Sequence, residues 1–168
     1  MSKLYFALQP DSDASDEITE IARAIAFEYD LAGPYTPEWL HLSLNGVGHF
    51  SLDLVDRAIA VGDGIWAPPV EVTLSDITPF GGDPTPLVLI ANKTPALEGL
   101  CDVLARAMKQ NGLPCAYSSQ PHVTFLKDNR VPKQVALARP IRWIAEEFVL
   151  IHRDSSLFEV VASWRLRR

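Results

Sequence analysis

The sequence predicts an α+β fold in which strands and helices form two similar halves around a shared cleft. Two observations carry this prediction. An apolar strand, an amphipathic helix and a second strand follow one another twice along the 168-residue chain, and further strand-like runs follow each copy. The length and the 48% share of hydrophobic residues suit a folded unit with a substantial core.

The first copy occupies the first quarter of the chain. Residues 4–8 are an apolar run that predicts a strand. Residues 15–31 predict a helix, because Ile18 and Ile25 are spaced for one apolar face and carboxylates lie near the expected start, where they suit the helix dipole. Residues 39–44 then predict the second strand.

The second copy repeats this order. Residues 87–91 predict a strand, and residues 95–111 predict a helix with an apolar stripe. Gly112 follows the last turn as a C-terminal cap. Residues 120–126 predict the second strand of this copy.

Further elements follow each copy. Residues 52–65 predict a helix in the first half, and residues 70–77 predict a strand after a pair of prolines. In the second half, residues 141–151 predict strands. The final strand, residues 157–164, is expected to pair with them through a turn at residues 154–156.

These elements predict one bilobal domain over residues 1–168, with an internal repeat over approximately residues 3–80 and 86–166. The glycine- and proline-containing stretch 81–84 marks the loop between the halves. No long linker separates them, so we expect the halves to pack as one unit. A closed two-lobe form needs no partner subunit, and we therefore expect a monomer.

Charge is distributed unevenly along a chain whose net charge is −6. Residues 1–84 hold three basic and fourteen acidic side chains, whereas residues 85–168 hold twelve basic and seven acidic ones. A local basic surface on the second half can attract a phosphate. The overall acidity argues against sequence-independent wrapping of long RNA or DNA.

Cysteine usage and hydropathy indicate the compartment. Cys101 and Cys115 form neither a disulfide framework nor a C-x-x-C motif, which fits a reducing environment. The apolar run at the N-terminus is too short for a signal peptide, and no stretch approaches the ~18–20 apolar residues of a membrane-spanning helix. We expect a cytoplasmic protein without a membrane partner.

The second strand of each copy carries a histidine followed two residues later by a hydroxyl: His41 with Ser43, and His122 with Thr124. The two histidines lie 37 and 35 residues after the first apolar residues, 4 and 87, of their copies. Side chains at i and i+2 of a strand share a face. One such pair indicates only a structural histidine, but two in matching positions predict a single site with the pairs facing across a cleft.

That arrangement suits in-line cleavage of a phosphodiester. One imidazole can take a proton from the attacking oxygen while the other protonates the leaving oxygen, each step being worth ~10²–10⁴-fold. Histidine titrates near neutral pH, so the two protonation states can coexist. Two hydroxyls can bind the non-bridging phosphate oxygens, where charge accumulates. This chemistry needs no metal and no cofactor, and we predict neither.

The remaining histidines and the four tryptophans predict structural roles. His49 follows a glycine-rich turn and is expected at the surface, and His152 ends an apolar strand. No pair of histidines has the helical spacing of a metalloprotease motif. The tryptophans are expected to pack in the core or between the lobes.

Residues 41–44 (His-Leu-Ser-Leu) and 121–125 (Pro-His-Val-Thr-Phe) resemble the paired His-x-(Thr/Ser)-x motifs of the two-histidine (2H) phosphoesterases. The most similar branch is the bacterial 2′-5′ RNA ligase, or RNA 2′,3′-cyclic phosphodiesterase, group with the LigT-like fold. The resemblance spans nearly the whole chain. It implies a bilobal α+β fold with two antiparallel sheets lining a central cleft and helices outside.

The resemblance also implies an activity and roles for the motif residues. A terminal 2′,3′-cyclic phosphate would be hydrolysed to a 2′-phosphate, with reversible action on 2′-5′ linkages. His41 matches the proton donor to the leaving 3′ oxygen, and His122 matches the proton acceptor that activates water. Ser43 and Thr124 match the hydroxyls that bind the phosphate.

Two stretches depart from the family pattern. Residues 45–48 (Asn-Gly-Val-Gly) stand where members often carry a bulky apolar pair, so an aromatic side chain is missing from the expected nucleotide pocket. Lys127 stands where an arginine is common. Lysine keeps the charge but loses bidentate phosphate geometry, and we assign Lys127 to substrate binding on this match alone.

Two alternatives to this activity remain open. The same site would suit small cyclic nucleotides or 2′-5′ oligonucleotides if the pocket is open. The basic second half would also suit a non-catalytic RNA-binding module. The expected partners are therefore RNA ends with a 2′,3′-cyclic phosphate or small nucleotide phosphodiesters.

Overall fold

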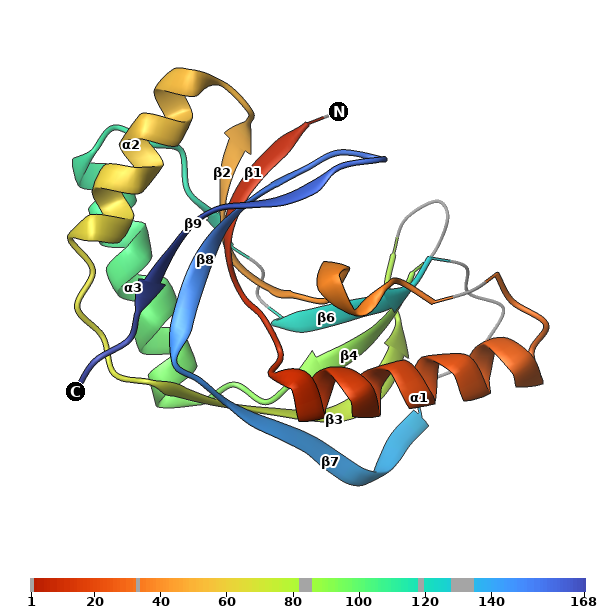
Figure 1. Ribbon diagram of the computed structural model, residues 1–168. Helices are drawn as coiled ribbons and strands as arrows, with labels where there is room; N and C mark the ends of the chain where they lie inside the picture. The colour runs from red at the N-terminus through yellow and green to blue at the C-terminus, as the bar shows by residue number, and fades with distance from the viewer. Residues whose placement is uncertain (1, 33, 82–85, 118–119, 128–134) are drawn as a thin grey trace.

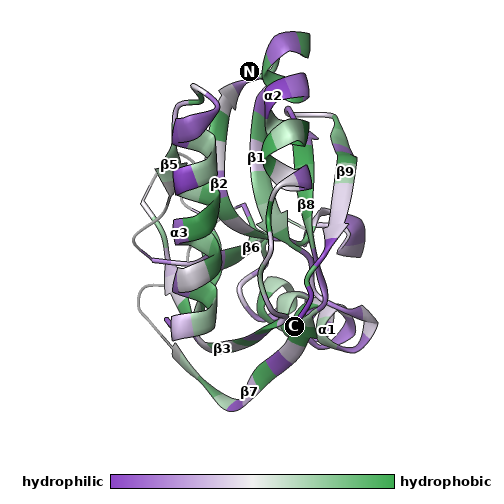
Figure 2. Ribbon diagram, turned by 90° about the vertical axis from the view of Figure 1, so that its left-hand side faces the viewer, coloured by the Kyte–Doolittle hydropathy of each residue, from purple (hydrophilic) through white to green (hydrophobic). Residues whose placement is uncertain are grey.

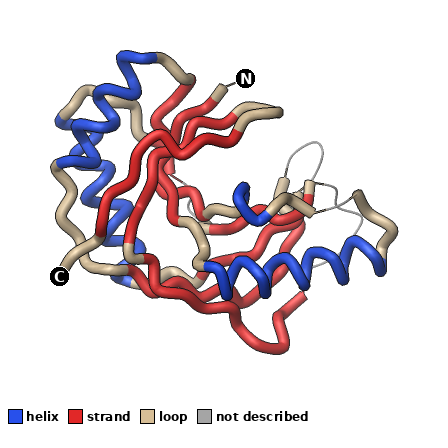
Figure 3. The backbone as a smooth tube through the Cα atoms, in the orientation of Figure 1, coloured by secondary structure: helices blue, strands red, loops and turns tan. Residues whose placement is uncertain are grey.

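The computed structural model describes residues 2–32, 34–81, 86–117, 120–127 and 135–168. Within these residues the chain forms one strongly curled antiparallel sheet with three α-helices packed on it (Figures 1 and 3). No helix of this part of the chain combines the length and apolarity that crossing a membrane requires. Most of the predicted loop 81–84 lies outside the described residues.

The first predicted copy is observed as β1 (Lys3–Leu8), α1 (Ser12–Glu28) and β2 (Leu42–His49). Helix α1 begins three residues before its predicted start, because Asp11 caps it by accepting a hydrogen bond from the Ala14 amide at 2.8 Å. The predicted strand over residues 39–44 is wrong at its beginning. A short 3₁₀-helix, η1 (Pro37–Trp39), stands there, and His41 immediately precedes β2.

The second predicted copy is observed as β4 (Leu87–Ala91), α3 (Pro95–Gln110) and β6 (His122–Leu126). Thr94 caps the start of α3 by accepting a hydrogen bond from the Leu97 amide. Gly112 ends it with a φ of +67°, so the predicted glycine cap is confirmed. A short strand, β5 (Ala116–Tyr117), lies between α3 and β6.

The elements that follow each copy are α2 (Leu52–Asp63), β3 (Val70–Pro79), β7 (Val135–Ala145), β8 (Glu147–Arg153) and β9 (Phe158–Arg165). β8 and β9 form the predicted hairpin. Its turn is held by the Asp154 carboxylate, which accepts hydrogen bonds from the Ser156 and Leu157 amides at 2.8 Å.

The expectation of two sheets is corrected to one. The strands run in the order β7-β3-β4-β6-β2-β1-β8-β9, with β5 also paired to β2. Leu42 of β2 pairs with Val123 of β6, and this link joins strands β2, β1, β8 and β9 to strands β6, β4, β3 and β7. Both groups of strands mix the two halves of the chain, because β8 pairs with β1 and β9 while β3 pairs with β4 and β7. The repeat boundaries and the single bilobal domain stay predictions.

The helices and the sheet share one large core. Leu42, Val123, Ile18 and Leu104 belong to the same buried hydrophobic cluster. Figure 2 shows hydrophobic residues running along the neighbouring strands β1 and β8. Helix α1 packs against β6, and α3 packs against β2, so each helix supports the motif strand of the other half. Because side chains alternate along a strand, the face of β2 and β6 opposite this core carries the motif side chains.

Candidate active site

The Leu42–Val123 pairing brings the two motifs together. Continued by one residue on either side, this antiparallel register would set Ser43 opposite His122 and bring His41, which immediately precedes β2, level with Thr124. Directly opposite side chains share a face, and their Cβ atoms lie about 4.5–5.5 Å apart, against about 7–8 Å for diagonal neighbours. The four polar side chains therefore form a compact set in which the two imidazoles occupy one diagonal.

The His41 ring is oriented by the backbone just before its own strand. Its Nδ1 lies 2.8 Å from the carbonyl oxygen of Trp39. A carbonyl only accepts hydrogen bonds, so Nδ1 carries the proton and, in the neutral ring, Nε2 is left as the basic nitrogen. The η1 turn places this carbonyl two residues before the histidine.

The His122 ring is held in the same way. Its Nδ1 donates to the carbonyl oxygen of Gln120 at 2.8 Å, again two residues earlier in the chain. The ring also packs on Phe80, with 4.3 Å between ring centroids. Both motifs thus present an imidazole of the same tautomer, with Nε2 available for proton transfer.

Burial disfavours the protonated, charged form of His41. The residue is only 8% exposed. Desolvation lowers its pKa to about 4, the hydrogen bond to the Trp39 carbonyl opposes this shift, and electrostatic interactions with Arg153 and His122 add to it. In the free protein at pH 7, His41 is therefore neutral.

A cleft of about 510 Å³ opens beside the motif side chains. Its lining includes His41, Ser43, Thr124, Tyr5, Arg153 and Lys3. His122 is not among the residues that line this cavity, and its ring packs on Phe80. The structure thus brings three of the predicted residues onto one cavity, and the fourth, His122, lies two residues before Thr124 on β6.

Arg153 is the site residue that the motif pattern misses. It ends β8, and its Nη2 donates to the Tyr35 hydroxyl at 3.0 Å. Its guanidinium carbon lies 5.3 Å from the Tyr35 ring centroid and 5.4 Å from that of Trp39. A basic residue at the end of an apolar strand is the only signal of this role in the sequence.

Tyr5 joins Arg153 beside His41. Its ring centroid lies 5.1 Å from that of the His41 imidazole. Burial raises the pKa of the Tyr5 phenol, and the adjacent Arg153 opposes this shift. The phenol is thus a neutral, nearly buried wall of the cleft.

Lys127 lies away from the phosphate cleft. Its side chain is exposed, and its ammonium sits 5.5 Å from the Tyr35 ring centroid, where it lines a neighbouring groove. The lysine therefore reaches the same aromatic ring as Arg153. Its assignment to substrate binding stays a prediction.

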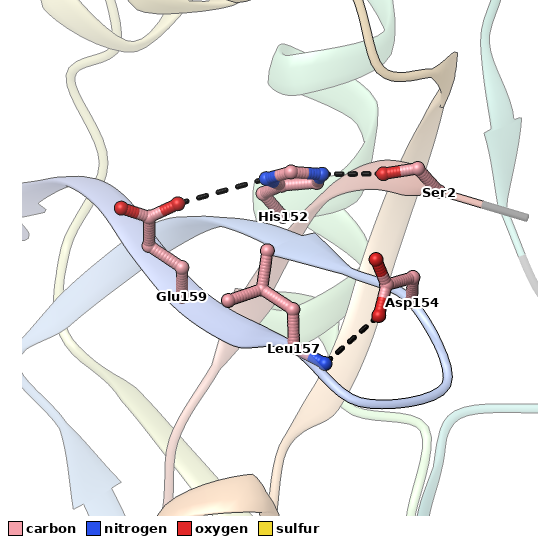
Figure 4. A network of polar contacts seen from close by, with 5 residues as sticks. All are labelled: Ser2, His152, Asp154, Leu157 and Glu159. Atoms are coloured by element: carbon pink, nitrogen blue, oxygen red, sulfur yellow. Dashed lines mark hydrogen bonds and ion pairs between the residues drawn. The ribbon is translucent and has the colours of Figure 1, made fainter.

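His152 holds strands together, as expected for a structural histidine. Figure 4 shows its ring between the Ser2 hydroxyl and the Glu159 carboxylate, the latter at 3.6 Å. The ring also stacks on Phe50, with 3.8 Å between centroids. These contacts link the start of β1, the segment after β2 and strand β9. His49 is exposed, as predicted.

The other sequence expectations have mixed outcomes. Trp143 is 3% exposed and Trp164 packs on the core, but Trp66 is 68% exposed, so its predicted packing role is wrong.

Burial raises the pKa of the Cys101 thiol to about 11, which makes it unreactive. Within the described residues, no cluster of histidine, cysteine or carboxylate side chains could hold a metal ion.

Comparisons with solved structures identify the fold. No protein-family model and no curated protein sequence matches the chain. The crystal structure of E. coli LigT in apo form matches with a TM-score of 0.79 and 20% identity over 99% of this chain and 98% of that one. The protein TT0787 of Thermus thermophilus matches with a TM-score of 0.78 and 18% identity over 98% of each chain.

A third solved structure shares part of this architecture. The MHV ns2 PDE domain matches with a TM-score of 0.56 and 14% identity over 86% of this chain and 98% of that one. Structures of E. coli LigT have also been solved in complex with ATP, 3′-AMP, NADP⁺ and phosphate. At these identities the matches establish the fold of the chain.

Proposed function

We propose, from the premise that this chain has the fold of the LigT-like 2H phosphoesterases, that it is an RNA 2′,3′-cyclic phosphodiesterase. It would hydrolyse a terminal 2′,3′-cyclic phosphate to a 2′-phosphomonoester by acid–base catalysis between two histidines. The observation that carries this proposal is the Leu42–Val123 pairing, which gathers both His-x-hydroxyl motifs on one face.

The proposed reaction needs one proton taken and one given. A water oxygen attacks phosphorus while its proton passes to Nε2 of His122. The bond between phosphorus and O3′ breaks, and O3′ takes a proton from Nε2 of a protonated His41. The hydroxyls of Ser43 and Thr124 donate hydrogen bonds to the non-bridging oxygens, whose charge increases in the transition state.

The low pKa of His41 bears on this assignment. With a pKa of about 4, only about one molecule in a thousand carries the protonated ring at pH 7. A phosphate anion beside the ring raises the pKa of the imidazole by about 1–3, as an opposite charge at this range does. The donor role of His41 therefore depends on bound substrate, whereas the free protein suits His41 as the acceptor.

The proposal is tested by incubating the purified protein with an RNA oligonucleotide that ends in a 2′,3′-cyclic phosphate, in a buffer that contains a metal chelator. We expect a 2′-phosphate end. His41→Ala and His122→Ala should each lose at least about 100-fold in rate. His49→Ala, which alters an exposed histidine outside the cleft, is the matched control. Absence of product, or equal rates in all three variants, contradicts the proposal.

The size of the cleft favours a second substrate class at the same site. About 510 Å³ is within the ~300–1,000 Å³ range of small-molecule pockets. Small cyclic nucleotides or 2′-5′ oligonucleotides would then be the substrates, and 2′-5′ ligation would be the reverse reaction. Comparing rates on 2′,3′-cyclic AMP and on the oligonucleotide separates these classes.

The RNA-binding alternative predicts that the protein binds the oligonucleotide without cleaving it, and that this binding persists when both histidines are replaced.

A further inference from the structure

A second cavity adjoins the phosphate cleft. It measures about 400 Å³, and its lining includes Pro34, Tyr35, Thr36, Trp39, Lys127 and Ser155. We call it the aromatic groove. Ser155 lines both cavities, and the Trp39 carbonyl is the group that orients His41. The two cavities are therefore neighbours that share one lining residue.

The aromatic groove is walled by an ordered set of rings. Tyr35 and Trp39 are stacked, with centroids 6.2 Å apart and an interplanar angle of 25°. Trp39 stacks in turn on Phe158, at 5.6 Å and 22°. Phe158 also contacts His41, with 5.5 Å between ring centroids. The rings thus support one another and reach from the groove to the candidate acid–base group.

Two positively charged side chains lie over the rings of the aromatic groove. Arg153 lies over both Tyr35 and Trp39 and also lines the phosphate cleft. The Lys127 ammonium lies over Tyr35 from an exposed position. This surface is therefore apolar and positively charged at once, which is complementary to a flat aromatic ring attached to an anion.

The phosphate cleft itself offers little to an aromatic ring. Its lining beyond the polar groups is Leu44, Gly46 and Ala116. Tyr5 is 9% exposed and already packs on His41, so it has little free surface for stacking. A nucleotide whose phosphate lies in the cleft therefore finds its stacking surface in the aromatic groove.

We propose that the aromatic groove binds the nucleobase of the nucleotide whose phosphate lies beside His41 and Thr124. This inference rests on the proposed function and deepens it. The base packs against Trp39 and Tyr35, and Arg153, which lines the phosphate cleft and lies over both of these rings, connects base and phosphate. Every base has a π-face, so such a platform discriminates nucleotides from base-free phosphodiesters more than one base from another.

The experiment compares 2′,3′-cyclic AMP with ribose 2′,3′-cyclic phosphate, which lacks the base. Trp39→Leu should raise KM for the nucleotide about 10-fold more than it raises KM for the base-free substrate, in keeping with the loss of one stacking contact. Trp39→Phe should restore most of the affinity. Trp66→Leu, at an exposed tryptophan outside both cavities, is the matched control. Equal changes in KM for the two substrates would contradict the proposal that the aromatic groove binds the base.

Binding of the nucleoside adenosine, followed by indole NMR signals, tests the groove apart from catalysis. Adenosine should shift the Trp39 signal but not that of Trp66, and Tyr35→Leu should weaken its binding by about 10-fold. If the protein turns over no cyclic phosphate but adenosine still binds in this way, the groove stands and the proposed function fails. If turnover is found while adenosine leaves the Trp39 signal unmoved, the groove fails and the proposed function stands.

Discussion

Leu42 and Val123 face each other across strands β2 and β6, and this pair joins strands β1, β8 and β9 beyond β2 to strands β4, β3 and β7 beyond β6. Both side chains are fully buried on the core face. The polar residues on either side of each must therefore point to the other face, towards the cleft. The same apolar contact that closes the sheet thus gathers the candidate catalytic groups.

The roles of the two histidines can be separated by the leaving group. We expect His41→Gln to lose much less activity on bis(p-nitrophenyl) phosphate than on a cyclic phosphate, because p-nitrophenolate leaves without a proton. His122→Gln should lose activity on both, since attack by water still needs a base. Initial rates on the two substrates measure this. The reverse pattern would assign the donor role to His122.

The buried imidazole of His41 should make stability depend on pH. Its pKa is about 4 in the folded protein and about 6.5 in the unfolded chain, so the unfolded state binds more protons between these values. The free energy of unfolding should therefore fall by about 3 kcal/mol as pH drops from 6.5 to 4.

Urea denaturation of the wild type and of His41→Gln across this range isolates the effect. Carboxylates that titrate below pH 5 contribute to both proteins and cancel in the difference. Relative to that of His41→Gln, the free energy of unfolding of the wild type should fall as the pH falls from 6.5 to 4. If the difference in free energy of unfolding between the two proteins does not change with pH, His41 titrates normally in the folded state.

Arg153 should contribute to substrate binding through its fixed guanidinium. We expect Arg153→Lys to raise KM by about 10-fold, because lysine keeps the charge but loses the planar fork that donates to phosphate and stacks on Trp39. Steady-state kinetics on 2′,3′-cyclic AMP measure the effect. The control is Arg142→Lys, at an exposed position on β7. Similar kinetics in the two variants would remove Arg153 from the site.

Two helix glycines should respond oppositely to alanine. A Cβ on Gly62 of α2 would lie 2.3 Å from the ring of Trp164, so Gly62→Ala should destabilise the fold by about 1–3 kcal/mol. A Cβ on Gly99 of α3 meets nothing within 4 Å. Gly99→Ala should therefore stabilise by up to about 1 kcal/mol through helix propensity. Thermal melts of both variants test this, and a stabilised Gly62→Ala would show that Trp164 repacks at little cost.

Much of the local structure could be predicted from the sequence because it depends on neighbours in the chain. The apolar spacing that marks α3 and the φ of Gly112 follow from periodicity and capping chemistry. The predicted boundaries were wrong where a local interaction favoured a different start of the element. Asp11 started α1 early through its cap, and Pro37 began a 3₁₀ turn in place of the first residues of a strand.

The sequence by itself determined that each motif sets a hydroxyl two residues after its histidine and places both motifs where an apolar run begins, since these are local properties of the chain. Only the tertiary structure decided that the described strands share one sheet, that burial holds His41 neutral, and that Arg153 and the aromatic groove adjoin the cleft. These features depend on pairing between strands distant in the chain, and burial and proximity arise only when such strands meet.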